Sequence, residues 1–346
     1  MQCAVITGPV FDLHDCPGHP ESAERLHASL AHLPAGTLIL DPVAAAEEDL
    51  ARVHLPGYLA WLRRLSPRSV TEDLSGRDTS TRGQARRAVE VSGFIDADTY
   101  FTPWTYGVAT YAAGAACMAA ERALEGKSSF ALVRPPGHHA LPGRAMGFCL
   151  VNNAAVAAAK ALGSVDRVAI VDWDEHHGNG TQEIFEKSAR VLYCSVHTEG
   201  IFPYTGKATE TGTGAGAGYT VNVPLLHGST IGDYAHVFTE LFLPALERAK
   251  PDLLIVSAGQ DALTCDPLSV MELCPADYGT LAGLLLDATG LCPAFVLEGG
   301  YGASHPEAIN AILRAVGGER STEPVPAPTD ATRARVRLFR KLHGFG

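Results

Sequence analysis

The stretch Arg167-Val-Ala-Ile-Val-Asp-Trp-Asp-Glu-His-His-Gly-Asn179, near the middle of the chain, joins an apolar run to a dense group of polar residues. The apolar part is unbroken and rich in β-branched residues, which is typical of a parallel strand covered on both faces. Asp174 and His176 follow where that strand should end. Ligand sites of open parallel sheets lie at the carboxyl ends of the strands. This stretch therefore predicts both the fold class and the place of the functional site.

Similar apolar runs alternate along the chain with stretches of helical character. The runs are Phe130–Val133, Val191–Val196, Leu253–Ser257 and Ala294–Leu297, and the helical stretches are Ala109–Leu124, Asn153–Leu162 and Tyr234–Arg248. Pro244 should kink or interrupt the last helix. Strands separated by helices indicate an α/β protein with a mainly parallel, doubly wound sheet. Because no repeat or Ser/Gly-rich linker divides the sequence, we expect residues 1–346 to form a single domain.

The composition is that of an ordinary globular protein. The 346 residues include 38 acidic and 27 basic side chains, for a formal charge of -11, and 46% are hydrophobic. Apart from Arg333–Lys341, Lys and Arg are not clustered, which argues against a general nucleic-acid binder. No apolar run is long enough to span a membrane, and the start lacks the features of a secretory signal. Eight cysteines without a Cys-x-x-Cys pair suit a reducing compartment, so we expect a cytoplasmic protein.

Oxygen and nitrogen donors from two predicted strands should meet at the carboxyl edge of the sheet. Side chains at positions i and i+2 of a strand end point the same way, so Asp174 and His176 can converge on one cation. Asp261 follows the run Leu253–Ser257 and adds a second carboxylate. Three such ligands with an open fourth position are what a catalytic Zn²⁺ requires. Helix capping or a turn explains any one of these residues alone equally well, but their repetition at several strand ends favours a metal site.

Two adjacent histidines, His138 and His139, follow the run Phe130–Val133 after a stiff Pro-Pro-Gly segment. A metal-activated water needs a base to take its proton and an acid to protonate the leaving amine, and one histidine can do both. Asp172 and Asn179 lie in the predicted metal loop and are available to set the basicity of the imidazoles. For an isolated pair of histidines, a surface location is the alternative.

A tyrosine, Tyr301, follows two glycines after the run Ala294–Leu297. The glycines permit close approach of the backbone, and a phenol O–H projecting into the site can stabilise an oxyanion. An ordinary turn followed by a half-buried tyrosine is the alternative. The composite reaction is metal-assisted attack of water on an amide carbonyl.

Six motifs occur in order along the chain: His19-Pro-Glu21 with Arg25, Arg134-Pro-Pro-Gly-His-His-Ala140, Gly147-Phe-Cys-Leu-Val-Asn-Asn153, Asp172-Trp-Asp-Glu-His-His-Gly-Asn-Gly-Thr-Gln182, Ser257-Ala-Gly-Gln-Asp261 and Leu297-Glu-Gly-Gly-Tyr301. They resemble the zinc-dependent histone deacetylase superfamily, which includes bacterial and archaeal deacetylase-like amidohydrolases and acetylpolyamine amidohydrolases. The resemblance covers nearly the whole chain. It implies an arginase/deacetylase-type three-layer α/β fold with a central, eight-stranded, mainly parallel sheet.

The resemblance also implies roles for the site residues. It assigns Asp174, His176 and Asp261 as zinc ligands, His139 as general base and acid, His138 as its electrostatic neighbour and Tyr301 as oxyanion donor. It implies a structural K⁺ held by Asp172, Asp174, the carbonyl of His176 and Ser195. It implies a substrate tunnel formed by Phe148, Phe202, Leu268, Gly147 and Gly300. Asn179 agrees with class II members, and Gln260 departs from the small or apolar residue expected before the third ligand.

The substrate is less specified. We favour acetyl-lysine in proteins or peptides, with an acetylpolyamine or another small acylated amine as the alternative. A cationic polyamine would need carboxylates at the tunnel mouth, and the expected rim segment holds Glu72, Asp73, Asp78, Asp96 and Asp98, although acidic residues are also common on solvated loops. A non-catalytic binding module should have lost a ligand or Tyr301, and a two-metal ureohydrolase needs an Asp where Gly178 stands. The sequence leaves open whether the chain forms a homo-oligomer.

Overall fold

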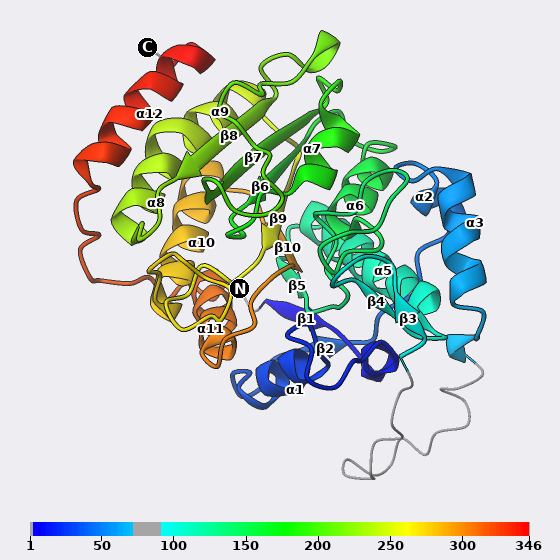
Figure 1. Cartoon of the computed structure of the whole chain (residues 1–346). Coiled ribbons are helices and arrows are strands. Elements are labelled where there is room, and N and C mark those ends of the chain that lie inside the picture. The colour runs from blue at the N-terminus through cyan, green and yellow to red at the C-terminus, as the bar shows by residue number, and fades with distance from the viewer. Residues whose placement is uncertain (1–2, 72–90, 346) are drawn as a thin grey trace.

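A central sheet of eight parallel strands organises the computed structural model, which describes residues 3–71 and 91–345 (Figure 1). The strand order is β2-β1-β5-β10-β9-β6-β7-β8, and every pairing in this sheet is parallel. The strands are β1 (Ala4–Ile6), β2 (Ile39–Leu40), β5 (Ser129–Ala131), β6 (Val168–Asp172), β7 (Val191–Thr198), β8 (Thr220–Leu225), β9 (Leu253–Ala258) and β10 (Ala294–Leu297). A short antiparallel pair, β3 (Gly93–Phe94) and β4 (Tyr100–Phe101), lies outside it.

Helices cover both faces of the sheet and make it the middle of three layers (Figure 1). The helices described are α1 (Glu24–Ala31), α2 (Glu47–Leu50), α3 (Pro56–Leu65), α5 (Thr105–Leu124), α6 (Asn153–Ala161), α7 (Asn179–Phe185), α8 (Ile231–Val237), α9 (Leu243–Ala249), α10 (Pro275–Thr289), α11 (His305–Val316) and α12 (Asp330–His343). The predicted α/β fold class and its eight-stranded parallel sheet are confirmed.

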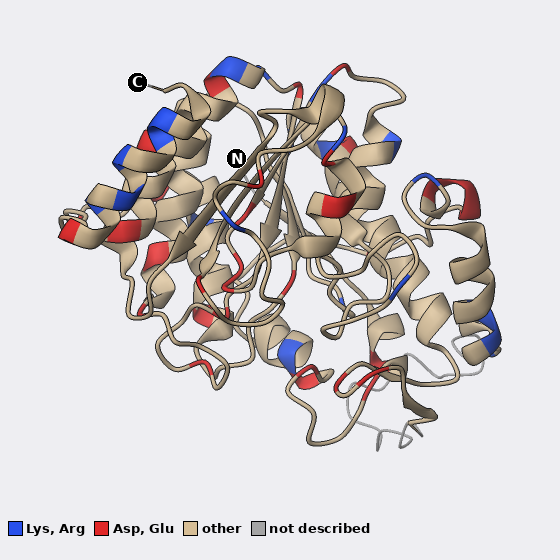
Figure 2. Cartoon of the chain, turned by 45° about the horizontal axis from the view of Figure 1, so that its top comes forward, with Lys and Arg blue, Asp and Glu red and all other residues tan. Residues whose placement is uncertain are grey.

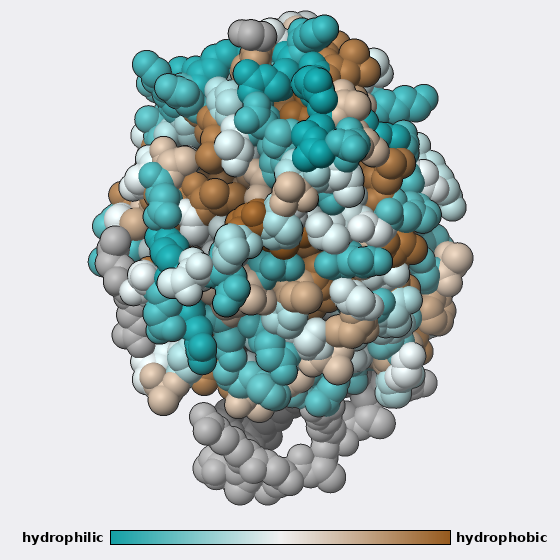
Figure 3. All heavy atoms as spheres, turned by 90° about the vertical axis from the view of Figure 1, so that its left-hand side faces the viewer, coloured by the Kyte–Doolittle hydropathy of each residue, from teal (hydrophilic) through white to brown (hydrophobic). Residues whose placement is uncertain are grey.

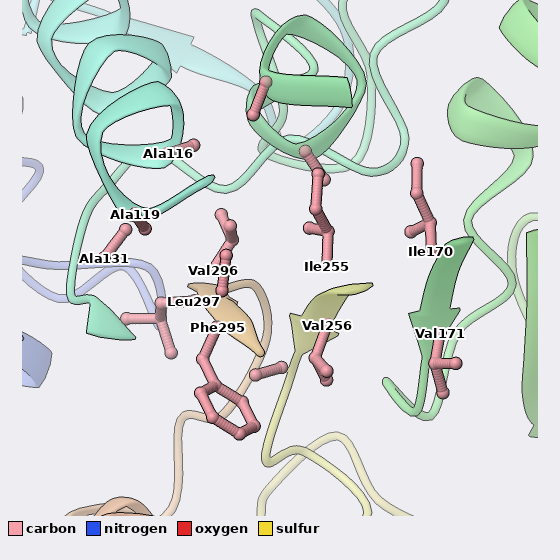
Figure 4. Packing of buried hydrophobic residues seen from close by; sticks show 14 of the residues in the cluster. Ala116, Ala119, Ala131, Ile170, Val171, Ile255, Val256, Phe295, Val296 and Leu297 are labelled. Carbon is pink, nitrogen blue, oxygen red and sulfur yellow. The ribbon is translucent and has the colours of Figure 1, made fainter. Parts of the chain in front are cut away.

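Alternating side chains of the strands fill both cores. Ala116 and Ala119 of α5 lie over one face of the sheet, whereas Phe295 of β10 projects from the opposite face (Figure 4). On that opposite face, Phe295 packs on Trp173, which in turn packs on Tyr278 of α10, with both ring centroid distances 6.1 Å. Burial on both faces explains why these strands are unbroken apolar runs instead of alternating ones.

The five predicted apolar runs all form strands of the central sheet, and its three other strands went unrecognised. Two of them, β1 and β2, are only three and two residues long, too short to show a pattern. The third, β8, contains Pro224, and proline is uncommon within strands, so its sequence does not predict one. Proline is tolerated there because β8 lies at the edge of the sheet, where one side of the backbone needs no strand partner.

Pro244 interrupts a helix as predicted. The chain runs from α8 through a π-helical turn, Phe238–Phe242, into α9, and Pro244 occupies the first turn of α9. Proline has no N–H to bond a carbonyl four residues earlier, so it is best placed where a helix begins.

The basic run Arg333–Lys341 falls on α12, along which Lys and Arg gather (Figure 2). Three of its arginines are neutralised locally, since Arg333 pairs with Asp330 at 2.5 Å, Arg335 pairs with Glu199 at 2.6 Å and Arg340 pairs with Glu240. On the α12 side of the molecule, hydrophobic residues form separate patches among hydrophilic ones (Figure 3). Within residues 3–71 and 91–345, no helix has the length and apolar character needed to cross a bilayer.

Candidate metal and catalytic site

Three predicted metal ligands lie together beyond the carboxyl ends of β6 and β9, which are neighbours in the sheet. His176 Nδ1 lies 2.8 Å from Asp261 Oδ2 and 3.3 Å from Asp174 Oδ1. Both carboxylates are buried, while the His176 side chain keeps 16% of its surface exposed. One donor atom from each residue fits within 4.8 Å of the others, so the three can bind a single cation.

The charges of this trio suit a bound cation. Burial and the neighbouring Asp174 carboxylate raise the pKa of Asp261 well above its usual value. Burial opposes protonation of His176, but hydrogen bonds with Asp174 and Asp261 outweigh it and raise the pKa of this imidazole. Two buried carboxylates therefore repel each other and compete for a proton. A divalent cation relieves that repulsion, and two carboxylate oxygens with one imidazole nitrogen are a donor set that divalent metals accept.

Backbone hydrogen bonds hold the two carboxylates in place. Glu175 N donates to Asp261 Oδ1 at 2.8 Å, and Gly299 N donates to Asp174 Oδ2 at 2.8 Å. The second bond requires a glycine, since a Cβ at Gly299 would lie 2.4 Å from Asp261 Oδ2. The ligand loops are thus bound to each other as well as to the sheet.

The two predicted catalytic histidines lie beside the metal ligands, and their environments differ. His138 Nδ1 lies 3.2 Å from Asp172 Oδ2, whereas His139 Nδ1 lies 2.8 Å from Asn179 Oδ1. Both imidazoles are buried, and their ring centroids are 4.0 Å apart. Asp172, which is also buried, accepts a second hydrogen bond from Tyr193 Oη at 3.0 Å.

These partners push the two imidazole pKa values apart. Burial lowers the pKa of His138, but Asp174 and Asp172 outweigh it and raise this pKa to about 10. Burial and the adjacent His138 charge lower the pKa of His139 well below its usual value. His138 is therefore an imidazolium, and His139 is a neutral base. With Nδ1 committed to Asn179, the Nε2 atom of His139 is left to exchange a proton.

Tyr301 lies in the turn that follows β10, where Gly300 adopts a φ of 115°. The Arg25 guanidinium stacks over the phenol ring with its carbon 4.6 Å from the ring centroid. Asp266 Oδ2 accepts hydrogen bonds from Gly302 N, at 2.8 Å, and from Tyr301 N. Burial raises the pKa of Tyr301 well above its usual value, so its hydroxyl keeps its proton and can donate.

Two half-buried phenylalanines flank this group. The Phe148 ring meets Tyr301 edge-on at 5.7 Å, and the Phe202 ring lies 5.1 Å from His139. Gly147 and Phe148 have φ values of 54° and 66° and form a tight turn. A Cβ at Gly147 would come within 2.7 Å of His139 Cδ2, so only glycine fits.

The structure describes some of the predicted rim residues but not all of them. Leu268 is 39% exposed, and its backbone N–H donates to Asp266 Oδ1 at 3.0 Å, in the loop that holds Tyr301. Phe148 N donates to Thr99 Oγ1 at 3.1 Å, which puts the segment containing Asp96 and Asp98 beside one aromatic wall. The other predicted acidic residues, Glu72, Asp73 and Asp78, lie outside the described residues.

The predicted potassium ligands span two adjacent strands. Asp172 of β6 lies directly opposite Ser195 of β7, and Asp174 and His176 follow in the same loop as Asp172. Ser195 Oγ also contacts His197 Nδ1 at 2.9 Å. Gln260, the residue that departs from the resemblance, is fully buried next to the predicted third ligand, Asp261, and its backbone N–H donates to Gly299 O at 3.0 Å.

Comparisons with known proteins identify the family of this chain. The family model of the histone deacetylase domain matches residues 19–316, which is most of the chain. The chain belongs to the histone deacetylase family. It is 38% identical over 320 residues to the histone deacetylase-like amidohydrolase of Pseudomonas aeruginosa, covering 88% of this chain and 78% of the relative. It is 36% identical to a probable deacetylase of Methanothermobacter thermautotrophicus, covering 94% and 93%.

Longer members of the histone deacetylase family also match. Histone deacetylase 15 of Arabidopsis thaliana is 38% identical over 327 residues, and the chain spans 55% of its length. The solved structure of the HDA15 HD domain superposes with a TM-score of 0.87 at 34% identity, covering 99% of this chain and 95% of that one. This histone deacetylase-family chain is therefore a hydrolase of the deacetylase/amidohydrolase type.

Two buried acidic residues, Glu21 and Glu298, belong to motifs that the sequence shares with the family, but the sequence predicted no role for them. Glu21 forms an ion pair with Arg134 at 2.6 Å, and both side chains have no exposed surface. Glu298 is equally buried and accepts hydrogen bonds from the loop that carries His138. The available signal was a charged residue directly after an apolar run, Glu298 after Ala294–Leu297 and Arg134 after Phe130–Val133, because burial of a charge there demands a partner.

Proposed function

We propose that this chain is a Zn²⁺-dependent deacetylase that hydrolyses the N-acetyl amide of acetyl-lysine in proteins or peptides, releasing acetate and the free amine. The observation that carries the proposal is the position of the Asp174–His176–Asp261 donor set beside two histidines of opposite charge. The proposal adds the metal, the reaction and the substrate to the family membership.

The residues present fit a catalytic zinc. Asp174, His176 and Asp261 would hold the ion with one oxygen or nitrogen atom each, which leaves further coordination positions for water and the substrate carbonyl. When bound, zinc polarises the amide carbonyl and makes water a better nucleophile. In the same proposal, Asp172, Asp174, the carbonyl of His176 and Ser195 hold a structural K⁺, for which the pairing of Asp172 with Ser195 is the support.

The remaining groups move protons and stabilise charge. Neutral His139 takes a proton from the attacking water and later gives it to the leaving amine nitrogen. Positively charged His138, 4.0 Å away between ring centroids, favours the negative charge that develops on the carbonyl oxygen. The Tyr301 hydroxyl, which keeps its proton, donates a hydrogen bond to that oxygen.

The walls suit a long apolar chain that ends in an amide. Phe148 and Phe202 would enclose the methylene groups of an acyl-lysine, while Gly147 and Gly300 allow the backbone to approach closely. Leu268 is apolar at the rim, which favours an acyl-lysine peptide. Asp96 and Asp98 belong to the segment beside Phe148 and favour the alternative, a cationic acetylpolyamine.

A side-by-side rate comparison tests the proposal. The zinc-loaded protein is assayed with an acetyl-lysine peptide, acetylspermidine and acetylputrescine, and a kcat/KM at least about ten-fold higher on the peptide supports our assignment. A clear preference for the polyamines would replace it with the alternative. No hydrolysis of any of the three would remove the deacetylase proposal.

Two further expectations remain proposals. Residues 1–346 act as one catalytic domain, because the site draws on segments from His19 to Tyr301 and on five neighbouring strand ends. The protein works in the cytoplasm, which the four buried free thiols of Cys3, Cys117, Cys149 and Cys194 support.

A further inference from the structure

One buried carboxylate connects segments from three neighbouring strands of the sheet near the candidate site. Glu298 directly follows β10, and its side chain has no exposed surface. Its Oε2 atom accepts hydrogen bonds from Gly137 N at 2.7 Å and from His138 N at 3.0 Å. Its Oε1 atom accepts a hydrogen bond from Ser257 Oγ of β9 at 3.1 Å.

The backbone around Glu298 is held from the other side by Arg25. The guanidinium donates from Nη2 to Glu298 O at 2.5 Å and from Nε to Gly300 O at 2.7 Å. The same guanidinium lies over the Tyr301 ring. Arg25 therefore holds the backbone at Glu298 and the turn that carries Tyr301 in a fixed relative position.

Three neighbouring strands meet at this carboxylate. The loop after β5 supplies Gly137 and His138, β9 supplies Ser257, and the end of β10 supplies Glu298 itself. Strand β10 lies between β5 and β9 in the sheet (Figure 1). The β5 loop presents the general base, and the β10 turn presents the oxyanion donor. No other bond within residues 3–71 and 91–345 joins a side chain of the β10 end to the N–H groups of that β5 loop.

We propose that Glu298 is a positioning residue that fixes His139 relative to Tyr301, by anchoring the backbone of the histidine loop to the tyrosine turn. This inference rests on the proposed function for its catalytic consequence. Glu298 does not touch substrate. Glu298 acts by accepting hydrogen bonds from the main-chain N–H groups of Gly137 and His138. The side chain at position 298 must therefore be long enough to bring an acceptor oxygen to these two groups, and a negative charge alone is insufficient.

Reach and charge can be separated by two conservative variants. Glu298→Gln keeps the chain length and one acceptor oxygen but removes the carboxylate. Glu298→Asp keeps the carboxylate but withdraws it by about one methylene, roughly 1.5 Å, from the two N–H groups. Positioning predicts that Gln works better than Asp, whereas an electrostatic effect on His138 predicts the reverse.

The experiment compares these two variants with the wild type and with Ser257→Ala, a matched control that removes only the Oε1 bond. We expect kcat within about five-fold of wild type for Glu298→Gln and Ser257→Ala. For Glu298→Asp we expect kcat to fall about 100-fold, because small misplacements of catalytic groups cost about that much. KM, zinc content and thermal midpoint should change little, so that the loss lies in kcat.

Near-normal kcat in Glu298→Asp together with a large loss in Glu298→Gln would overturn the proposal, as would near-normal kcat in both. If the variants do not fold, amide hydrogen exchange of the wild type still decides. Gly137 N–H and His138 N–H should be strongly protected although they lie in a loop, and rapid exchange of both would refute the anchor. That measurement needs no turnover, so it stands even if acetyl-lysine proves not to be a substrate.

Discussion

His176 and Asp261, 85 residues apart in the sequence, meet with Nδ1 2.8 Å from Oδ2 at the adjacent ends of β6 and β9. An imidazole and two carboxylates buried together are costly unless a cation or a shared proton compensates, and one cation can satisfy all three groups.

Replacing Asp261 by Ala should empty the metal site. The loss of one of three protein ligands is expected to lower zinc content from about one per chain to near zero after dialysis, and deacetylation by at least about 1,000-fold. Elemental analysis and a peptide assay measure both. The exposed Asp287, which pairs with Arg320, provides the control Asp287→Ala, which should keep its zinc. Full zinc occupancy in Asp261→Ala would refute the ligand assignment.

Replacing Tyr301 by Phe removes one hydroxyl and leaves the ring between Arg25 and Phe148. We expect kcat to fall about 100–1,000-fold, the range for losing one oxyanion donor, with KM and zinc content nearly unchanged. Tyr204→Phe is the matched control, since Tyr204 is 75% exposed. An active Tyr301→Phe enzyme would exclude the hydroxyl from the reaction.

Asn179→Asp should move the pH profile of the enzyme. Burial and the His138 charge hold the pKa of His139 well below its usual value, so the base stays neutral in the wild type. A carboxylate at 179 would face His139 Nδ1, where the amide oxygen now lies at 2.8 Å, and would raise this pKa. A raised pKa keeps the base protonated to higher pH, so the acidic limb of kcat/KM should shift upward. An unchanged limb would contradict the role of His139.

Glu21 should make stability depend on pH. Burial raises the pKa of Glu21, but the Arg134 guanidinium outweighs it and holds this pKa at about 2. A depressed pKa means that the stabilisation is present above the unfolded value, near 4.5, and is lost as the pH falls towards 2. Glu21→Gln leaves Arg134 buried without its counter-charge and should cost about 3–5 kcal/mol at pH 7.

Urea unfolding of wild type and Glu21→Gln at pH 7, 4 and 3 measures this difference, which should shrink with falling pH. The control Glu125→Gln removes a carboxylate that pairs with Lys127 on the surface, where solvent screens the pair, and should leave the free energy of unfolding unchanged within error. A gap between wild type and Glu21→Gln that stays constant across the three pH values would show that the charge of Glu21 is not responsible.

Much of the fold was predictable from particular stretches. The run before Asp172 is apolar at every position because both faces of β6 are buried. This pattern involves only consecutive residues, so the sequence alone is enough to predict the strand. The short strands β1 and β2 were not predictable, since three or two residues cannot display a period and their pairing is decided by neighbours far along the chain. Strand β8 was not predicted because it contains Pro224, and proline is tolerated in a strand only where the missing N–H needs no partner, as at the edge of a sheet.

The sequence by itself determined which chemical groups are present and at which strand ends they occur, because side-chain type and strand periodicity are local properties. It placed Asp174 and His176 on one side of a strand end and named the partners His139 and Tyr301. Only the tertiary structure decided their charges and distances. His138 and His139 are adjacent in sequence, yet one faces Asp172 and the other Asn179, and burial in those two environments drives their pKa values in opposite directions. The anchoring contact of Glu298 is likewise a matter of distance between three strands, which no local pattern encodes.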